Sequence, residues 1–153
     1  MTTWPHVFTD SVHLIVDANV WVLRDDKDLY RAERQRLEML HAFAASIGFR
    51  RSWFQTPQRP HYDVTTPPAA ERAIRAGANL VNMRDLAVLS YPTGTTRPVS
   101  RPEGWTPTLL GRDLREEIAF ARSENVRLMR MFSGNRRVGL RGVYHLNKAQ
   151  TLL

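Results

Sequence analysis

The chain has 153 residues, of which 42% are hydrophobic and 24% are charged. These values predict one globular domain, alone or with an extension, and they exclude a disordered chain. The sequence has no cysteine, which excludes disulfides, thiolate metal sites and a cysteine nucleophile. No apolar run approaches the length of a membrane-spanning helix, and from the first residues we expect no signal peptide. We therefore expect a cytoplasmic protein without a membrane partner.

The formal net charge is +7, and only two of the 22 basic residues, Lys27 and Lys148, are lysines. Arginine presents a rigid fork of donors that suits phosphate, and it stacks on nucleobases. The charge therefore indicates an anionic partner: a nucleic acid, a nucleotide or an acidic protein. A genome rich in G and C produces the same arginine excess, so the charge describes attraction and not activity.

The first part of the chain predicts two short strands and a long helix. Residues 6–9 and 12–16 are short apolar runs that suit strands. A helix is expected from Asp28, as its N-cap, to Gly48, as its C-cap. The apolar positions that share one face of this helix are Leu37, Leu40, Phe43 or Ala44, and Ile47.

The next segment predicts a loop and two further helices. Residues 56–60 hold two prolines and no apolar pattern, so they predict a loop. Thr65 and Thr66 before two prolines predict the start of a helix that ends at Gly77. Residues 80–81 suit a short strand. Residues 83–91 suit a short helix with Leu86 and Leu89 turned inward.

The C-terminal third begins with a segment rich in Pro, Gly and Thr at residues 93–108, which predicts a surface loop or linker. We expect a helix after it, with Leu110, Leu114, Ile118 and Ala121 on one face and an end near Asn125. Residues 126–132 are rich in strand formers and predict a strand. Ser133, Gly134 and Asn135 predict a turn, residues 136–142 a basic hairpin or loop, and residues 143–146 a last strand.

This order of elements predicts an α/β or α+β fold, a small mixed sheet with helices packed on it. Three regions follow from it: an α/β core over residues 1–92, the loop or linker over residues 93–108, and an extension over residues 109–153 that packs on the same core.

Residues 37–78 gather most of the residues that could bind a ligand or perform chemistry. The candidate catalytic residues are His61 and Asp63, because an imidazole titrates near neutral pH and the two side chains share one face of an extended segment. The alternative is a structural hydrogen bond between them, with Asp63 helping to cap the next helix. The candidate ligand-binding residues are His41, Arg50, Arg51, Trp53, Gln55, Tyr62, Arg72 and Arg75. Their arginines suit phosphate, and their aromatic rings suit base stacking.

This stretch resembles a small bacterial and phage domain-of-unknown-function family, number four thousand and thirty-one. The resemblance is carried by Leu-His-Ala-Phe-Ala-Ala-Ser-Ile-Gly at residues 40–48, Arg-Ser-Trp-Phe-Gln at 51–55, His-Tyr-Asp at 61–63 and the arginine-led segment at 72–78. A looser match is the histidine-led strand at residues 13–17. The resemblance implies a fold class and a site in a protein of a bacterium or a phage-infected bacterium. It implies no reaction, and the cofactor remains unknown.

Two weaker signals lie outside this stretch. Residues 13–20 resemble the opening of PIN-type nucleases, in which an aspartate such as Asp17 would bind a metal with Asp85 or Glu116. The C-terminal basic patch, Arg127, Arg130, Arg136, Arg137 and Arg141, could grip phosphates or could be a solvated hairpin. The chain contains no phosphate-binding glycine loop, no nucleophilic-serine motif and no histidine pair with metal-ligand spacing.

These patterns favour a small basic protein that binds a phosphate-bearing small molecule or nucleic acid, with possible hydrolase or transferase activity. One alternative is a non-catalytic phage or bacterial accessory protein that captures an acidic host protein through exposed aromatics at Trp21, Trp53 and Trp105. The other is a metal-dependent, PIN-like nuclease.

Overall fold

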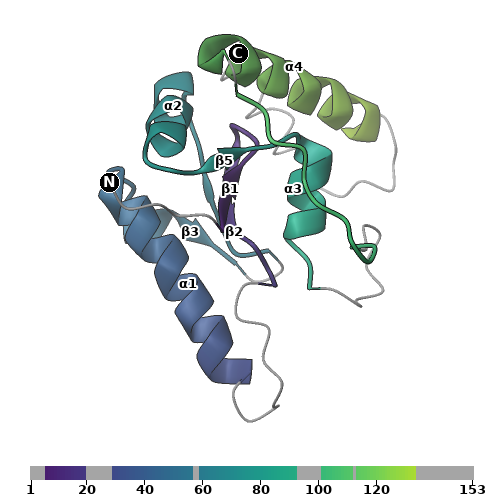
Figure 1. The fold of residues 1–153 in the computed structure, drawn as a ribbon. Coiled ribbons are helices and arrows are strands. Elements are labelled where there is room, and N and C mark those ends of the chain that lie inside the picture. The colour runs from purple at the N-terminus through teal and green to yellow at the C-terminus, as the bar shows by residue number, and fades with distance from the viewer. Residues whose placement is uncertain (1–5, 20–28, 57–58, 93–100, 112, 134–153) are drawn as a thin grey trace.

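The computed structural model describes residues 6–19, 29–56, 59–92, 101–111 and 113–133. Within these ranges the chain forms a five-stranded mixed sheet with helices packed on it (Figure 1). The predicted fold class, α/β or α+β with a small mixed sheet, is confirmed. In the part of the chain that the structure describes, no helix has both the length and the apolar character needed to cross a membrane.

The strands are short and come from distant parts of the sequence. Their bounds are Val7–Thr9 (β1), His13–Val16 (β2), Phe54–Gln55 (β3), His61–Asp63 (β4) and Asn79–Leu80 (β5). The order across the sheet is β3-β4-β2-β1-β5. β1 and β2 form an antiparallel hairpin, β4 pairs antiparallel with β2, and β3 pairs antiparallel with β4. β5 lies parallel to β1.

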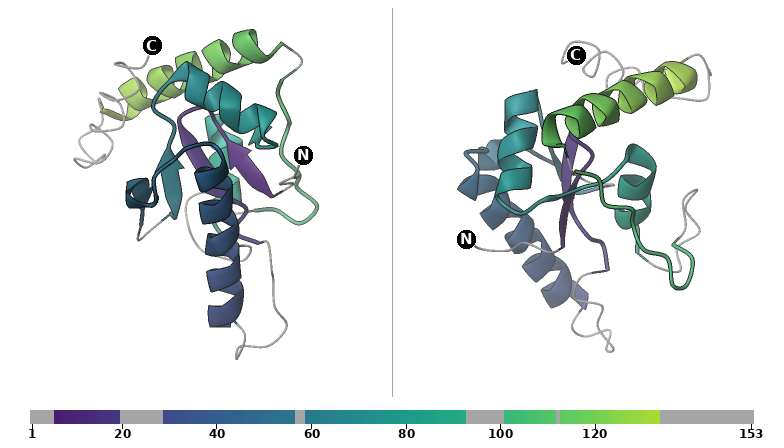
Figure 2. Two further views of the ribbon diagram at one scale, coloured as in Figure 1. Left: turned by 90° about the vertical axis from the view of Figure 1, so that its left-hand side faces the viewer. Right: turned by 45° about the horizontal axis from the view of Figure 1, so that its top comes forward.

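Helices cover both faces of this sheet. Their bounds are Leu29–Ser46 (α1), Pro67–Arg75 (α2), Met83–Leu89 (α3) and Leu114–Ser133 (α4), with a 3-10 turn at Arg51–Trp53 (η2). α1 and α2 lie on one face, α3 lies on the other, and α4 crosses one end of the sheet (Figures 1 and 2). This arrangement divides the sheet into an α1 face and an α3 face.

Each face of the sheet has its own hydrophobic core, because successive side chains of a strand point to opposite faces. On the α1 face, Leu14 and Tyr62 pack with the apolar sides of α1 and α2, and Ile118 of α4 joins them. On the α3 face, Phe8 and Ile15 pack with residues of α3, and Trp105 is packed against this cluster. The sheet thus separates two sets of side chains that are neighbours in sequence.

The long helix α1 agrees with its sequence pattern. Leu40, Phe43, Ala44 and Ile47 are all buried, as the three- and four-residue spacing predicts. Gly48 follows the helix with φ of +87°, a left-handed conformation that glycine adopts without steric cost. The position of Asp28, the expected N-cap, lies outside the described residues.

The start of α2 and the inward face of α3 are also confirmed. The Thr66 side chain accepts a hydrogen bond from the Ala69 N–H, and Pro67 occupies the first helical position, where its missing N–H is not needed. In α3, Leu86 and Leu89 are buried as expected. The Asn82 side chain caps α3 by accepting from the Asp85 N–H.

The prediction for the C-terminal third is wrong in two respects. Leu110 precedes α4 instead of lying on it, and its N–H bonds to the Leu80 carbonyl. Residues 126–132 continue α4 instead of forming a strand, and Ser133 ends the helix instead of opening a turn. The reason is that Asn125, taken as the end of the helix, is itself a buried helical residue. The hairpin and last strand expected beyond residue 133 lie outside the described residues.

Residues 101–111 form neither a helix nor a strand, in keeping with the loop predicted there, but they are held against the core. Arg101 forms an ion pair with Asp17, with 2.7 Å between Nη2 and Oδ1. The Thr108 N–H donates to the Asp85 carboxylate. Residues 93–100 are not among the described residues.

Candidate functional site: two histidines on one face of the sheet

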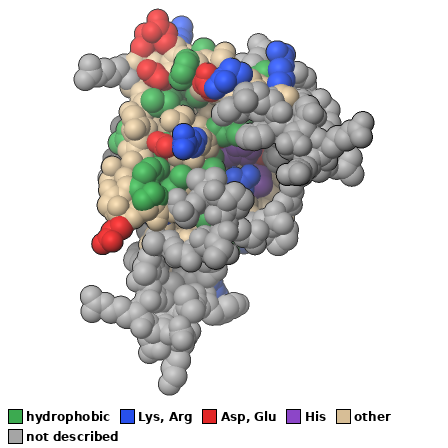
Figure 3. Space-filling model, turned by 90° about the vertical axis from the view of Figure 1, so that its right-hand side faces the viewer, with side chains coloured by type: hydrophobic (Ala, Val, Ile, Leu, Met, Phe, Trp, Pro, Cys, Tyr) green, Lys and Arg blue, Asp and Glu red, His purple; other side chains and the backbone are tan. Residues whose placement is uncertain are grey.

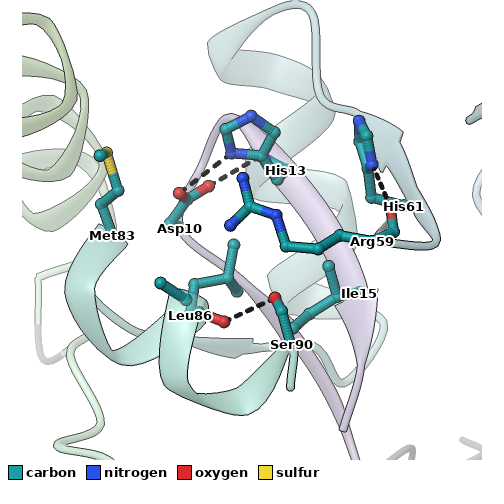
Figure 4. Close-up of a pocket in the computed structure, with 9 residues that line it drawn as sticks. Asp10, His13, Ile15, Arg59, His61, Met83, Leu86 and Ser90 are labelled. Carbon is teal, nitrogen blue, oxygen red and sulfur yellow. Dashed lines mark hydrogen bonds and ion pairs between the residues drawn. The ribbon is translucent and has the colours of Figure 1, made fainter. Parts of the chain in front are cut away.

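A small pocket opens between the α3 face of the sheet and α3 (Figure 4). Its volume is about 60 Å³, which is room for a few water molecules. The residues that line it are Asp10, His13, Ile15, Arg59, His61, Met83, Leu86, Ala87 and Ser90. We call it the two-histidine pocket. In Figure 3 histidine atoms lie beside basic atoms in a hollow of the surface on this side of the molecule.

The turn between β1 and β2 positions Asp10 and His13. The Asp10 carboxylate accepts hydrogen bonds from the backbone N–H groups of Val12 and His13, at 3.0 and 2.7 Å. Its second oxygen lies 3.1 Å from Nδ1 of the His13 ring. Ser11 adopts a left-handed φ of +72°, which is uncommon for a residue other than glycine. The backbone therefore bends so that one buried carboxylate can hold the His13 imidazole.

The Asp10 side chain is completely buried yet favours its charged form. Burial alone raises the pKa of its carboxyl. The charge of His13 and the hydrogen bonds from the His13 ring and from the N–H groups of His13 and Val12 outweigh that effect, so the pKa lies below its ordinary value. An ionised Asp10 can only accept hydrogen bonds, so His13 Nδ1 carries the proton between them.

Helix α4 anchors the same turn from behind. Arg122 is 2% exposed and donates from Nη2 to the Ser11 carbonyl at 2.8 Å and to the Val64 carbonyl at 3.5 Å. Asn125 is 1% exposed and donates to the Asp10 carbonyl at 3.2 Å. Burial lowers the pKa of the Arg122 guanidinium, and the charge of Asp10 acts against this. Two buried side chains of α4 thus fix the backbone that carries Asp10.

His61 reaches the same pocket from the neighbouring strand. In the antiparallel register of β2 and β4, His13 lies opposite Asp63, so His13, His61 and Asp63 point to one face. The His13 and His61 rings meet edge to face, with their centroids 5.6 Å apart. The prediction that His61 and Asp63 share a face is confirmed, and His61 Nε2 lies 3.5 Å from Asp63 Oδ1.

The hydrogen bond of His61 Nδ1 fixes the tautomer of that ring. Nδ1 lies 2.7 Å from the Arg59 carbonyl, and a carbonyl only accepts, so Nδ1 is the donor. The other ring nitrogen, Nε2, is buried beside the Asp63 carboxylate. Asp63 also accepts a hydrogen bond from the Gln55 amide. Both histidines thus carry a proton on Nδ1.

Arg59 supplies the basic group of the pocket. Its exposed side chain extends from the segment before β4 and points into the pocket (Figure 4). Its guanidinium carbon lies 6.0 Å from the centroid of the Tyr91 ring. A guanidinium with open access to solvent and two imidazoles beside it form a group of donors that suits a phosphate.

The sheet separates His41 and Tyr62 from this pocket. Tyr62 precedes Asp63 and points to the α1 face, where its hydroxyl lies 2.7 Å from His41 Nδ1. Burial and the charge of Arg51 lower the pKa of His41, and Glu38 acts against this. Burial raises the pKa of Tyr62, and Arg51 acts against it. The two residues thus form a separate pair within the aromatic cluster of Phe49 and Phe54.

The predicted phosphate-binding arginines are not gathered in one place. Arg50 lies over the Trp53 ring, 5.9 Å from its centroid. Arg75 pairs with Glu71 on the surface of α2 at 2.8 Å, and Arg72 is exposed on the same helix. Arg130 is exposed near the end of α4. The other members of the expected basic patch beyond residue 133, Arg136, Arg137 and Arg141, lie outside the described residues.

The sequence did not single out Asp10, Arg59, Arg122 or Asn125. One signal for Asp10 was present: an aspartate stands three residues before a histidine, between two predicted strands. The roles of Arg122 and Asn125 depend on tertiary contacts across more than 100 residues of sequence and left no local signal.

The acidic residues of the PIN-like alternative have other contacts. Asp17 is paired with Arg101, Asp85 accepts from the Thr108 N–H, and Glu116 is exposed on α4. Among the described residues, no group of three or more His, Asp or Glu side chains is placed to hold a metal ion. These contacts do not favour the PIN-like nuclease, which stays a prediction.

The chain belongs to the family described as Protein of unknown function (DUF4031), whose model matches residues 14–91. The resemblance noted in the sequence is thereby confirmed. The match includes residues 14–16 of β2, the strand β4 and the helices α1 to α3, whereas Asp10, His13 and α4 lie outside it. No curated protein and no solved structure matches the chain.

Proposed function

We propose that this protein binds a phosphate-bearing ligand, a nucleotide or nucleic acid, in the two-histidine pocket and catalyses hydrolysis or transfer at that phosphate. The observation that carries the proposal is the pair of imidazole rings 5.6 Å apart, each held through Nδ1. Two imidazoles fixed in this way can act as a general base and a general acid on one substrate.

The chemistry assigns one proton transfer to each ring. His13, oriented by the buried Asp10, takes a proton at Nε2 from the attacking water or hydroxyl as its oxygen bonds to phosphorus. His61 Nε2 is buried beside Asp63, so the ring would turn toward the pocket to give a proton from Nε2 to the leaving oxygen as the other P–O bond breaks. The carboxylates stabilise the positive rings, Asp10 at Nδ1 of His13 and Asp63 beside Nε2 of His61.

Arg59 would hold the phosphate. Its guanidinium points into the pocket and can donate two hydrogen bonds to phosphate oxygens. This assigns to Arg59 the role that the sequence gave to Arg51, Arg72 and Arg75. The net charge of +7 would favour the approach of a polyanion. Donors aimed at a phosphate stabilise the charge that builds on its oxygens during transfer.

The test is turnover by the purified full chain with mononucleotides and short RNA and DNA oligonucleotides, followed by chromatography of the products. We expect His13→Ala and His61→Ala each to lower kcat by about 100-fold or more, because each removes one general acid or base. The wild-type rate should show a bell-shaped dependence on pH.

The matched control is His6→Ala, which removes an exposed histidine at the turn before β1 and should leave kcat unchanged. Circular dichroism would establish that the variants fold. Turnover that survives in both His13→Ala and His61→Ala would rule out the acid–base roles. No turnover by the wild type on any substrate would rule out the reaction.

One observation favours the non-catalytic alternative, capture of an acidic protein. Trp53 is 45% exposed, and the exposed Arg50 and Arg51 lie next to it. Exposed tryptophan and arginine are enriched where proteins bind one another. A stoichiometric acidic protein that the wild type recovers from a lysate, and that Trp53→Ala does not, would support this alternative.

A further inference from the structure

We infer that the ligand of the two-histidine pocket is a single strand of nucleic acid and that one base of this strand stacks on Trp53. This inference rests on the proposed function, because it names the substrate class of the same site. The stacked base lies in a second pocket, lined by Ser52, Trp53, Gln55, Asp63 and Thr65. We call it the Trp53 pocket. Its volume is about 260 Å³, against about 60 Å³ for the two-histidine pocket.

The pairing of β3 with β4 brings the two pockets together. Gln55, which lines the Trp53 pocket, lies directly opposite His61 in the register of these strands. Opposite residues on antiparallel strands point to the same face of the sheet, with their Cβ atoms about 5 Å apart. His61 in turn lines the two-histidine pocket. A chain of nucleotides can therefore continue from one pocket into the other.

Trp53 provides the stacking surface. Its side chain is 45% exposed, although two neighbours hold the ring. The centroid of the Phe49 ring lies 5.9 Å from that of Trp53, and the guanidinium carbon of Arg50 also lies 5.9 Å from it. Proteins that bind single strands use exposed aromatic rings in this way, because an unpaired base offers a flat face to the ring. In a duplex the neighbouring base pairs cover these faces, so the surface suits a single strand.

The polar groups of the Trp53 pocket do not select a base. Asp63 is 6% exposed, one of its oxygens accepts from the Gln55 amide, and the other lies 3.5 Å from His61 Nε2. These contacts engage the carboxylate within the protein. The other polar side chains of the pocket, Ser52 and Thr65, end in hydroxyls, which donate and accept hydrogen bonds equally well. The strand is therefore bound without a strong preference for its sequence.

Arginines lie at both ends of the β3–β4 hairpin. The exposed Arg50 and Arg51 precede Trp53 at the start of β3. The exposed Arg59 precedes β4 and points into the two-histidine pocket (Figure 4). Because β3 and β4 are antiparallel, their starts are at opposite ends of the hairpin. A strand that follows the hairpin meets a basic group on each side of the stacked base, which suits successive phosphates. A free mononucleotide carries phosphate at one end only and cannot contact both groups.

The test is fluorescence anisotropy of the full chain with labelled oligothymidylate and oligoadenylate of about twelve nucleotides, and with the duplex that the two form. We expect each single strand to bind at least about tenfold more tightly than the duplex and than thymidine monophosphate, measured as a competitor. The two single strands should agree within about threefold. Trp53→Ala should weaken both by about tenfold. Arg51→Gln should reduce the slope of the logarithm of the affinity against that of the salt concentration by about 0.7.

The matched control is Phe120→Ala, since Phe120 is a large aromatic residue on α4 that is 55% exposed and lines neither pocket. It should change no affinity. Equal affinity for the single strands and the duplex, or for the single strands and the mononucleotide, would overturn the single strand as ligand. An unchanged affinity in Trp53→Ala would overturn the stacking surface.

Turnover and the binding of inorganic phosphate separate this inference from the proposed function. Single strands that bind and are weakened by Trp53→Ala, with no turnover and no binding of phosphate, would support the stacking surface and contradict the proposed reaction. Turnover of mononucleotides alone, abolished in His61→Ala, would support the proposed reaction and overturn the single strand. Binding of neither oligonucleotide nor phosphate would overturn both.

Discussion

The imidazole rings of His13 and His61 meet edge to face with their centroids 5.6 Å apart, although the two residues are separated by 48 positions in the sequence. Each ring is held by a hydrogen bond at Nδ1, one to the buried carboxylate of Asp10 and the other to the Arg59 carbonyl. The antiparallel pairing of β2 and β4 produces this meeting, and the proposed chemistry depends on it.

The lowered pKa of Asp10 predicts that the folded protein loses stability in acid. The pKa of its carboxyl lies below the ordinary value of 3.8 in the folded state, so the unfolded chain binds a proton first as the pH falls. The stabilisation is fully present well above pH 3.8 and is lost as the pH falls below that value toward the folded pKa. Urea unfolding from pH 6 to pH 3 should show this loss in the wild type.

In Asp10→Asn this part of the pH dependence should disappear, and the variant should be about 1–3 kcal/mol less stable at pH 6, because charge-assisted hydrogen bonds are lost. A pH dependence parallel to that of the wild type would show that Asp10 is not stabilised as a carboxylate.

Tyr62→Phe should destabilise the fold by about 1 kcal/mol. The Tyr62 hydroxyl is hydrogen-bonded to His41 Nδ1 at 2.7 Å, and the substitution leaves that nitrogen without this partner. Thermal unfolding measures the effect. The control is Tyr91→Phe, because Tyr91 is half-buried and its ring packs against the Arg59 guanidinium. Equal effects of the two substitutions would argue against a stabilising Tyr62–His41 bond.

Arg51→Gln should raise the pKa of His41 but leave it below the ordinary value of 6.5. Burial and the charge of Arg51 together lower that pKa, and only the second cause is removed. Titration of the imidazole protons by NMR measures the change. Arg50→Gln is the control, since Arg50 is the adjacent arginine and lies over Trp53. A His41 pKa that responds equally to both substitutions would contradict a specific effect of Arg51.

Arg122→Ala should destabilise the fold by about 2–4 kcal/mol, because it removes the donor to two buried carbonyls and leaves a cavity. It should also move the NMR signals of His13, since the turn that holds Asp10 loses its anchor. Arg127→Ala removes an exposed arginine paired with Glu124 on the same helix and should cost less than about 1 kcal/mol. His13 signals that do not move in Arg122→Ala would contradict the anchoring role.

The sequence predicted correctly those helices and helix ends that depend on residues close together in the chain. The apolar face of α1, its glycine terminator and the Thr66 cap of α2 each depend on residues within a few positions of one another. β3 and β4 were not predicted as strands because their sequences, Phe-Gln and His-Tyr-Asp, contain no run of apolar residues. Their pairing is determined by contacts with distant residues.

The end of α4 was missed for a different reason. Its buried positions continue with helical spacing through Ile118, Ala121, Arg122, Asn125 and Val126. Two of these residues are polar, so the apolar pattern stops although the buried face of the helix continues. Arg122 and Asn125 are buried because they bind the β1–β2 turn, a partner that the sequence of α4 does not reveal.

The candidate site was predicted in part. The sequence brought His61 and Asp63 together correctly, from the alternation of side chains along an extended segment. It grouped them with Tyr62, which the same alternation places on the other face once residues 61–63 form a strand, and with His41 of α1, which is the partner of Tyr62 on that face. The partner of His61 in the pocket, His13, comes from another strand, and pairing between strands cannot be deduced from either one alone.

The most direct test of the two-histidine pocket is an NMR titration of the full chain with inorganic phosphate, following the imidazole protons of each histidine. The account predicts that the signals of His13 and His61 move together and saturate, that those of His6 and His41 stay in place, and that Arg59→Ala weakens the binding by about tenfold or more. Movement of the His41 signals alone, or no movement of the His13 and His61 signals, would contradict a phosphate site between these two residues.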